Sequence, residues 1–97
     1  MRAITFKQPG AVDVLQEIDA PKPRPEKGQL LIKVHTAAVN RTDIMRREST
    51  DQEPPYPILG VEVAGEVIEN KSEDSKFTPG ARVCGLVNLG GYAEYAV

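Results

Sequence analysis

Thiol and imidazole groups are nearly absent from this sequence, whose 97 residues include one cysteine, Cys84, and one histidine, His35. One cysteine cannot form a disulfide within the chain, and these two side chains fall short of the roughly three or four ligands of a thiolate or imidazole metal site. No Asp, Ser or Cys stands at a spacing that would orient His35 for catalysis. We therefore expect His35 to be a partly exposed residue and the protein to reside in a reducing compartment, the cytoplasm.

Long apolar runs and basic clusters are missing as well. No stretch approaches the roughly 20 apolar residues of a spanning helix, and the first ten residues, MRAITFKQPG, lack the apolar segment of a signal peptide. The 12 basic and 14 acidic residues are spread along the chain and leave a net charge of −2. No patch could therefore neutralise a row of phosphates. We expect a soluble, unexported protein that binds neither membrane nor nucleic acid.

Phosphate-binding loops are also absent, because no segment matches the GxGxxG or Walker patterns. Gly60 and Gly65 stand close together, but they lie within a run that alternates like a strand. We expect no cradle for a dinucleotide or a nucleoside triphosphate in these residues alone.

Short apolar runs separated by proline and glycine dominate what is present. Their alternation predicts about seven short strands, among them the runs at residues 1–6, 14–19, 29–40, 58–70, 81–87 and 91–97. The run at 29–40 is dense in Leu, Ile and Val and predicts a central strand, whereas 14–19 predicts an edge strand. This pattern is typical of a mainly β domain, a small barrel or sandwich.

Two residues within these runs have more specific expectations. Gly65 interrupts a strand, which indicates a bulge or a close backbone approach. Cys84 lies inside an apolar run, and we expect its thiol to be buried and inert.

Residues 20–28, with three prolines, predict a stiff surface connector.

One short helix is predicted over residues 41–49. Asn40 is a favoured N-cap residue, and Asp43 three positions later resembles the second half of a capping box. The proline-rich residues 50–57 that follow must form a loop. Tyr56 is the only large side chain of that loop, and a contact with a ligand and a cover for a nearby core are about equally favoured.

Four stretches together go beyond periodicity: AAVNRTD at 37–43, PILGVEVAGEV at 57–67, TPGARVCGL at 78–86 and GGYAEYAV at 90–97. In this order and spacing they resemble the N-terminal, GroES-like catalytic domain of the medium-chain dehydrogenase/reductase superfamily. The resemblance covers essentially the whole chain. It implies a GroES-like, partly open β-barrel with one short helix.

The resemblance also implies a branch without zinc. Zinc-dependent relatives carry Cys at the position of Asn40 and a His-Glu pair at that of Val61-Glu62, and they have a four-cysteine lobe that this chain lacks. The chain is therefore similar to the zinc-independent quinone oxidoreductases, and NRTDIMRR is particularly similar to the p53-inducible quinone oxidoreductase-like members. Such enzymes transfer hydride from NADPH to quinones or other conjugated double bonds. Without a Lewis acid, the acceptor itself must stabilise the developing negative charge.

Roles for the polar residues follow from the same resemblance. Asn40 would be catalytic and would contact the nicotinamide or the substrate with its amide. Arg41 would approach the cofactor phosphates, and Thr42 stands where relatives keep a proton-relay hydroxyl. Without zinc that relay loses its source, and a structural role is the alternative for Thr42. Asp43 is expected to orient the helix or, as the second reading, to act in catalysis.

Two further residues receive roles. Glu62 matches a glutamate beside the zinc of the dehydrogenases, and here we expect a structural hydrogen bond. Tyr56 is proposed as a lid over the acceptor.

The resemblance implies that residues 1–97 are an incomplete domain. The Rossmann domain that binds most of the cofactor is absent, so we expect weak or no NADPH binding by these residues alone, and a homodimer for the full-length protein. Two alternatives remain: a relative that keeps the fold as a non-catalytic binding module, and a co-chaperonin-like ring subunit. The polar, proline-stiffened loop at 20–28 disfavours the ring, because such subunits dock through an apolar tripeptide on a flexible loop.

Overall fold

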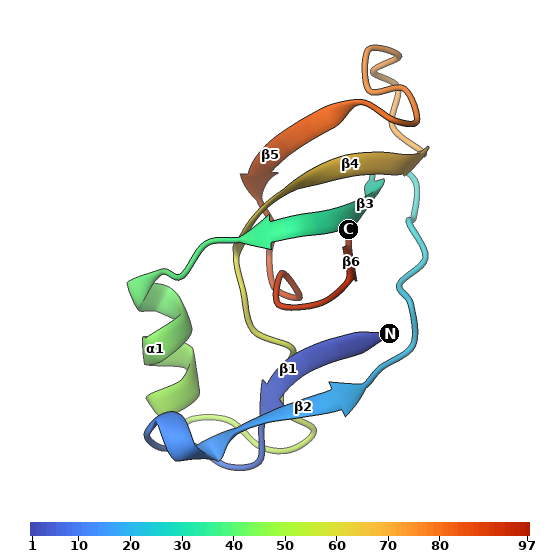
Figure 1. The fold of residues 1–97 in the computed structure, drawn as a ribbon. Helices are drawn as coiled ribbons and strands as arrows, with labels where there is room; N and C mark the ends of the chain where they lie inside the picture. Colours follow the sequence, from blue (N-terminus) through green and yellow to red (C-terminus); the bar gives the residue numbers. More distant parts are fainter.

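Six strands and one α-helix form the fold in a computed structural model that describes residues 1–97 (Figure 1). The strands are β1 (Arg2–Phe6), β2 (Leu15–Asp19), β3 (Leu30–Ala37), β4 (Glu62–Asn70), β5 (Arg82–Leu86) and β6 (Tyr95–Ala96). The helix α1 spans Arg41–Glu48, and a 3₁₀ turn, η1 (Val12–Val14), precedes β2. No helix has both the length and the apolar character needed to cross a membrane.

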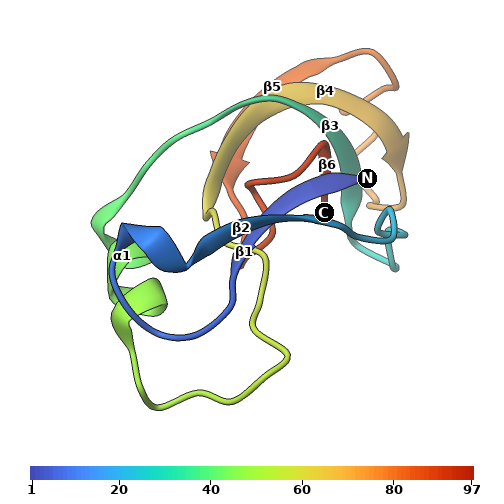
Figure 2. The same cartoon turned by 60° about the horizontal axis from the view of Figure 1, so that its bottom comes forward.

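The strands form one curved and open layer. β1 pairs with β2, and the other four strands follow the order β5-β4-β3-β6. The segment before β6 joins the two groups, because the Ile4 N–H donates to the Tyr92 carbonyl at 2.8 Å and the Val34 N–H donates to the Glu94 carbonyl at 2.9 Å. No pairing joins β2 to β5. Figure 2 shows β3, β4 and β5 arching over β1 and β2, so the expected partly open barrel is confirmed.

A small core lies between the sheet and the loop that follows α1. Phe6, Val14 and Leu59 form a buried cluster, against which Tyr56 and Tyr92 pack. The rings of Phe6 and Tyr56 stack with centroids 4.8 Å apart. The prediction of a loop at residues 50–57 is confirmed, and Tyr56 covers the core from that loop.

Gly65 lets two strands approach closely. A side chain there would place its Cβ 2.0 Å from the Lys33 carbonyl oxygen, and the β3–β4 register shifts between Val34 and Thr36, next to the pair Val34–Gly65. The expected bulge and close approach are both present.

Several predicted boundaries were too generous. The structure has six strands rather than about seven, β4 begins at Glu62 rather than at residue 58, and β6 has two residues. Residues 58–61 are apolar but extend toward the 90–92 segment instead of pairing with β3: the Tyr92 N–H donates to the Leu59 carbonyl at 2.8 Å. Apolar character alone does not distinguish these two partners.

The expected burial of Cys84 is wrong, because this thiol is exposed. Its strand, β5, pairs with β4 on one side only, and most of its residues face solvent. His35 is exposed, as expected, with its Nε2 3.9 Å from Glu66 Oε1.

Candidate functional site

The site begins where β3 leads into α1. Asn40 has an extended backbone and is the N-cap of α1, with Asp43 as its N3 residue in a capping box. The Asn40 N–H donates to Asp43 Oδ2 at 2.8 Å, and the Asp43 N–H donates to the Asn40 carbonyl at 3.0 Å. The predicted cap is confirmed, and it fixes the backbone of Asn40 at the start of the helix.

The Asp43 carboxylate is buried and accepts three hydrogen bonds, and we call this group the hub. It is 5% exposed, yet it faces no cation within ion-pair distance. Besides the Asn40 N–H, it accepts the Gly60 N–H at 3.2 Å and the Tyr92 hydroxyl at 2.7 Å. Hydrogen bonds and the positive end of α1 thus stabilise its charge in place of a cation. Three segments far apart in the sequence meet at this group.

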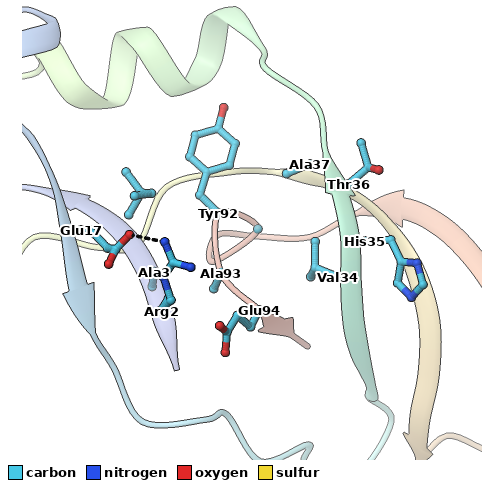
Figure 3. Close-up of a pocket in the computed structure, with 12 residues that line it drawn as sticks. Arg2, Ala3, Glu17, Val34, His35, Thr36, Ala37, Tyr92, Ala93 and Glu94 are labelled. Atoms are coloured by element: carbon cyan, nitrogen blue, oxygen red, sulfur yellow. Dashed lines mark hydrogen bonds and ion pairs between the residues drawn. The ribbon is translucent and has the colours of Figure 1, made fainter.

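Tyr92 donates to this hub from the segment before β6. Its partial burial, and then the hydrogen bond and the negative charge of Asp43, raise the pKa of Tyr92 above its usual range. The hydroxyl therefore remains a donor at neutral and moderately alkaline pH. Figure 3 shows its ring extending from the 91–94 segment toward α1, and Tyr92 also lines a surface hollow together with Arg2, Glu17 and Glu94.

The amide of Asn40 is held by Glu62, the first residue of β4. Asn40 Nδ2 donates to Glu62 Oε1 at 3.1 Å. An ionised carboxylate can only accept, so this bond fixes which end of the amide faces Glu62. One of the two Nδ2 hydrogens is used in this bond, and the other remains for a ligand. The expected structural hydrogen bond of Glu62 is thus present.

A pocket opens beside this amide. Asn40, Arg41 and Thr42 form its polar side, and Val61, Leu86 and Val87 form its apolar side. Leu86 is 80% exposed, and Val39, next to the pocket, is 78% exposed. The arrangement places an apolar wall and a hydrogen-bond donor in one pocket.

The predicted site residues do not all meet here. Asn40, Arg41 and Thr42 line the pocket, and Asp43 lies buried behind them. Tyr56 lies elsewhere, stacked on Phe6 in the core cluster. No group of three or more His, Cys, Asp and Glu side chains comes together in a geometry that could hold a metal ion.

Comparison with known proteins identifies the domain. The family of alcohol dehydrogenase GroES-like domains matches residues 26–97. The chain belongs to this family. The resemblance expected from the sequence is therefore confirmed.

The relatives of this GroES-like domain are longer than the chain. A quinone oxidoreductase of Lama guanicoe is 39% identical over 101 residues, which cover 100% of this chain and 31% of that protein. The structure of the quinone oxidoreductase from Coxiella burnetii matches with a TM-score of 0.87 and 35% identity, over 98% of this chain and 33% of that one. A mycobacterial protein solved in complex with NADPH matches with a TM-score of 0.84 and 33% identity, over 98% and 29%. The chain thus spans about a third of the length of these proteins.

The residues that line this pocket could hold a ligand with an apolar ring and a carbonyl group. The apolar wall of Val61, Leu86 and Val87 suits a flat ring, and the free Asn40 hydrogen suits a carbonyl. Reasoning from the sequence missed Tyr92 and Gly60 as parts of the site. The only signal was their place in the GGYAEY and LGVE stretches, which says nothing of their contact with Asp43.

Proposed function

We propose that this GroES-like domain is the N-terminal part of a longer NADPH-dependent oxidoreductase. The enzyme transfers hydride to quinones or other conjugated carbonyl compounds without zinc. Relatives named quinone oxidoreductase, at 39% identity along the whole chain, support the class of reaction, and the NADPH complex of a similar structure supports the cofactor. The observation that carries the proposal is the Asn40 amide, oriented by Glu62 beside an apolar wall.

Asn40 is the residue that we assign to the reacting carbonyl. Bound NADPH would supply the hydride, and the electron pair of the acceptor would then move onto its carbonyl oxygen. The free Nδ2 hydrogen of Asn40 donates to that oxygen as its charge develops, and the Glu62 carboxylate keeps the amide aimed. A donor placed in advance in this way lowers the barrier more than it strengthens substrate binding.

The other two pocket residues receive supporting roles. Thr42 is exposed at the pocket, and its hydroxyl can pass a solvent proton to the reduced acceptor. Arg41 is exposed and forms no ion pair within the domain, so its charge is available to a cofactor phosphate. We assign Asp43 to positioning Asn40 and Tyr56 to the core.

The donor set disfavours catalytic zinc. Neither Asn40 nor Val61 offers a thiolate or an imidazole, and the two carboxylates nearby, Glu62 and Asp43, already accept hydrogen bonds within the domain. The acceptor must therefore be activated by its own conjugation. The homodimer and the cytoplasmic location stay predictions for the longer protein.

The test uses the full-length protein encoded by the gene that contains this chain. We expect NADPH oxidation in the presence of a benzoquinone or an enone, none with a simple ketone, and no stoichiometric zinc in the purified enzyme. NADPH binding without turnover of any acceptor would instead support the non-catalytic module. A seven-membered ring in sedimentation would support the co-chaperonin alternative.

A further inference from the structure

We infer that Tyr92 is a positioning residue for the reaction, and that it acts on Asn40 through Asp43. This inference rests on the proposed function, since Asn40 is the group that it positions. Tyr92 does not line the pocket beside Asn40. Its single hydroxyl hydrogen is nearer to Asp43 Oδ2, at 2.7 Å, than to the Ala38 carbonyl, at 3.4 Å, so we assign its effect to the carboxylate. The two donors meet at one atom: the Tyr92 hydroxyl lies 2.7 Å and the Asn40 N–H 2.8 Å from Asp43 Oδ2.

The backbone of Tyr92 is rigid enough to transmit a position. Its N–H donates to the Leu59 carbonyl and its carbonyl accepts from the Ile4 N–H, both at 2.8 Å. Its neighbour Gly91 donates to the Gly60 carbonyl at 2.9 Å. The ring therefore starts from a segment that is hydrogen-bonded to β1 and to residues 58–60, and it points toward α1, as Figure 3 shows.

Tyr92 is also the only side chain among the donors to this hub. The Gly60 and Asn40 donors belong to the backbone, which no substitution can remove without moving the chain. If the Tyr92 hydroxyl is lost, Asp43 Oδ2 is held by the Asn40 N–H alone. The Gly60 N–H still binds Oδ1, so two donors hold the carboxylate instead of three, and the N-cap becomes more mobile with it. A shift of the N-cap would move the Asn40 amide away from the reacting oxygen.

The decisive variant is Tyr92→Phe in the full-length enzyme, because it keeps the ring and removes one hydroxyl. The matched control is Tyr95→Phe, three residues along the same segment, whose ring contacts Lys22 and whose hydroxyl forms no hydrogen bond within the domain. We expect Tyr92→Phe to lower kcat about tenfold while the KM for NADPH changes by less than about twofold. Tyr95→Phe should leave both values unchanged.

A lower kcat with a nearly unchanged KM separates a positioning role of Tyr92 from a role in folding. A variant that is only less stable has fewer active molecules, but each keeps the kcat of the wild type once the folded fraction is measured by active-site titration. A normal kcat per folded molecule for Tyr92→Phe would overturn the inference. An equal loss in Tyr95→Phe would overturn it as well, because the effect would then not pass through Asp43.

A second readout keeps the inference testable if the proposed function fails. If the wild-type protein oxidises no NADPH with any quinone or enone, the proposed reaction is wrong, and hydrogen exchange of the peptide spanning residues 38–45 decides the structural link. Faster exchange of this peptide in Tyr92→Phe but not in Tyr95→Phe supports the link from Tyr92 to the N-cap. Equal exchange in both variants overturns it.

Discussion

Two polar segments of this GroES-like domain have similar composition but opposite environments. The first, Asn40–Asp43, starts α1, and the second, Asn70–Lys76, forms the excursion after β4. Both begin with an asparagine and contain an aspartate that bonds to nearby backbone N–H groups. Asp43 is buried, whereas Asp74 is exposed and pairs with Lys76 at 3.5 Å.

The difference lies in how far the side chains of Asp43 and Asn70 reach along the chain. Asp43 binds Gly60 and Tyr92, which are 17 and 49 positions away. Asn70 binds Asp74 and Phe77, at most 7 positions away. Local hydrogen bonds let a polar segment turn in water, but distant partners bury it and give it one position.

The largest expected contrast is between two glycines of positive φ. Gly60 and Gly80 have φ values of 95° and 91°, so an alanine at either position pays about 1–2 kcal/mol of backbone strain. At Gly60 the added Cβ would also lie 2.5 Å from the Tyr92 nitrogen, whereas at Gly80 it would meet nothing. We expect Gly60→Ala to lower the free energy of unfolding by about 3–4 kcal/mol and Gly80→Ala by about 1 kcal/mol. Urea unfolding measures both, and equal losses would contradict the contrast.

The second largest difference in stability is expected between alanine variants of the two aspartates, Asp43 and Asp74. Asp43→Ala leaves the Gly60 and Asn40 N–H groups without an acceptor and leaves the Tyr92 hydroxyl only the Ala38 carbonyl, at 3.4 Å. We expect it to lower the free energy of unfolding by about 2–3 kcal/mol. Asp74→Ala removes an exposed pair and should cost less than about 1 kcal/mol. If the two variants unfold at the same urea concentration, the buried hub contributes no more than a surface ion pair.

Alanine variants of the two asparagines, Asn40 and Asn70, distinguish an effect on activity from an effect on local structure. Asn40→Ala in the full-length enzyme should lower kcat/KM by an amount equal to about 1–2 kcal/mol of transition-state stabilisation, the size of one lost polar contact. Asn70→Ala removes bonds to Asp74, Phe77 and Ser72 and loosens the excursion, but it should leave kcat/KM unchanged. Steady-state kinetics with a quinone compare the two. Unchanged kinetics in Asn40→Ala would remove this amide from the site.

The sequence predicted what depends on near neighbours. The cap of α1, the loop at 50–57 and the close approach at Gly65 each follow from residue types within a few positions, and the structure confirms them. Cys84 and the strand start at residue 58 were predicted wrongly, because burial and pairing depend on which distant segment lies alongside. Asn40, Arg41 and Thr42 were placed together since they are adjacent in the chain. Tyr92 could not be found, because its bond to Asp43 joins residues 49 positions apart.

The smallest expected effect is a pH dependence that only the buried segment should show. Burial and Asp43 raise the pKa of Tyr92 in the folded protein above the unfolded value of about 10. The unfolded chain therefore releases this proton at a pH where the native state keeps it, and stability falls as the pH rises above about 10. The contribution is fully present below that pH. Tyr92→Phe lacks this proton. The difference in free energy of unfolding between this variant and the wild type, measured in urea, should therefore shrink between pH 8 and 10.5. A constant difference would show that Tyr92 ionises alike in the folded and unfolded states.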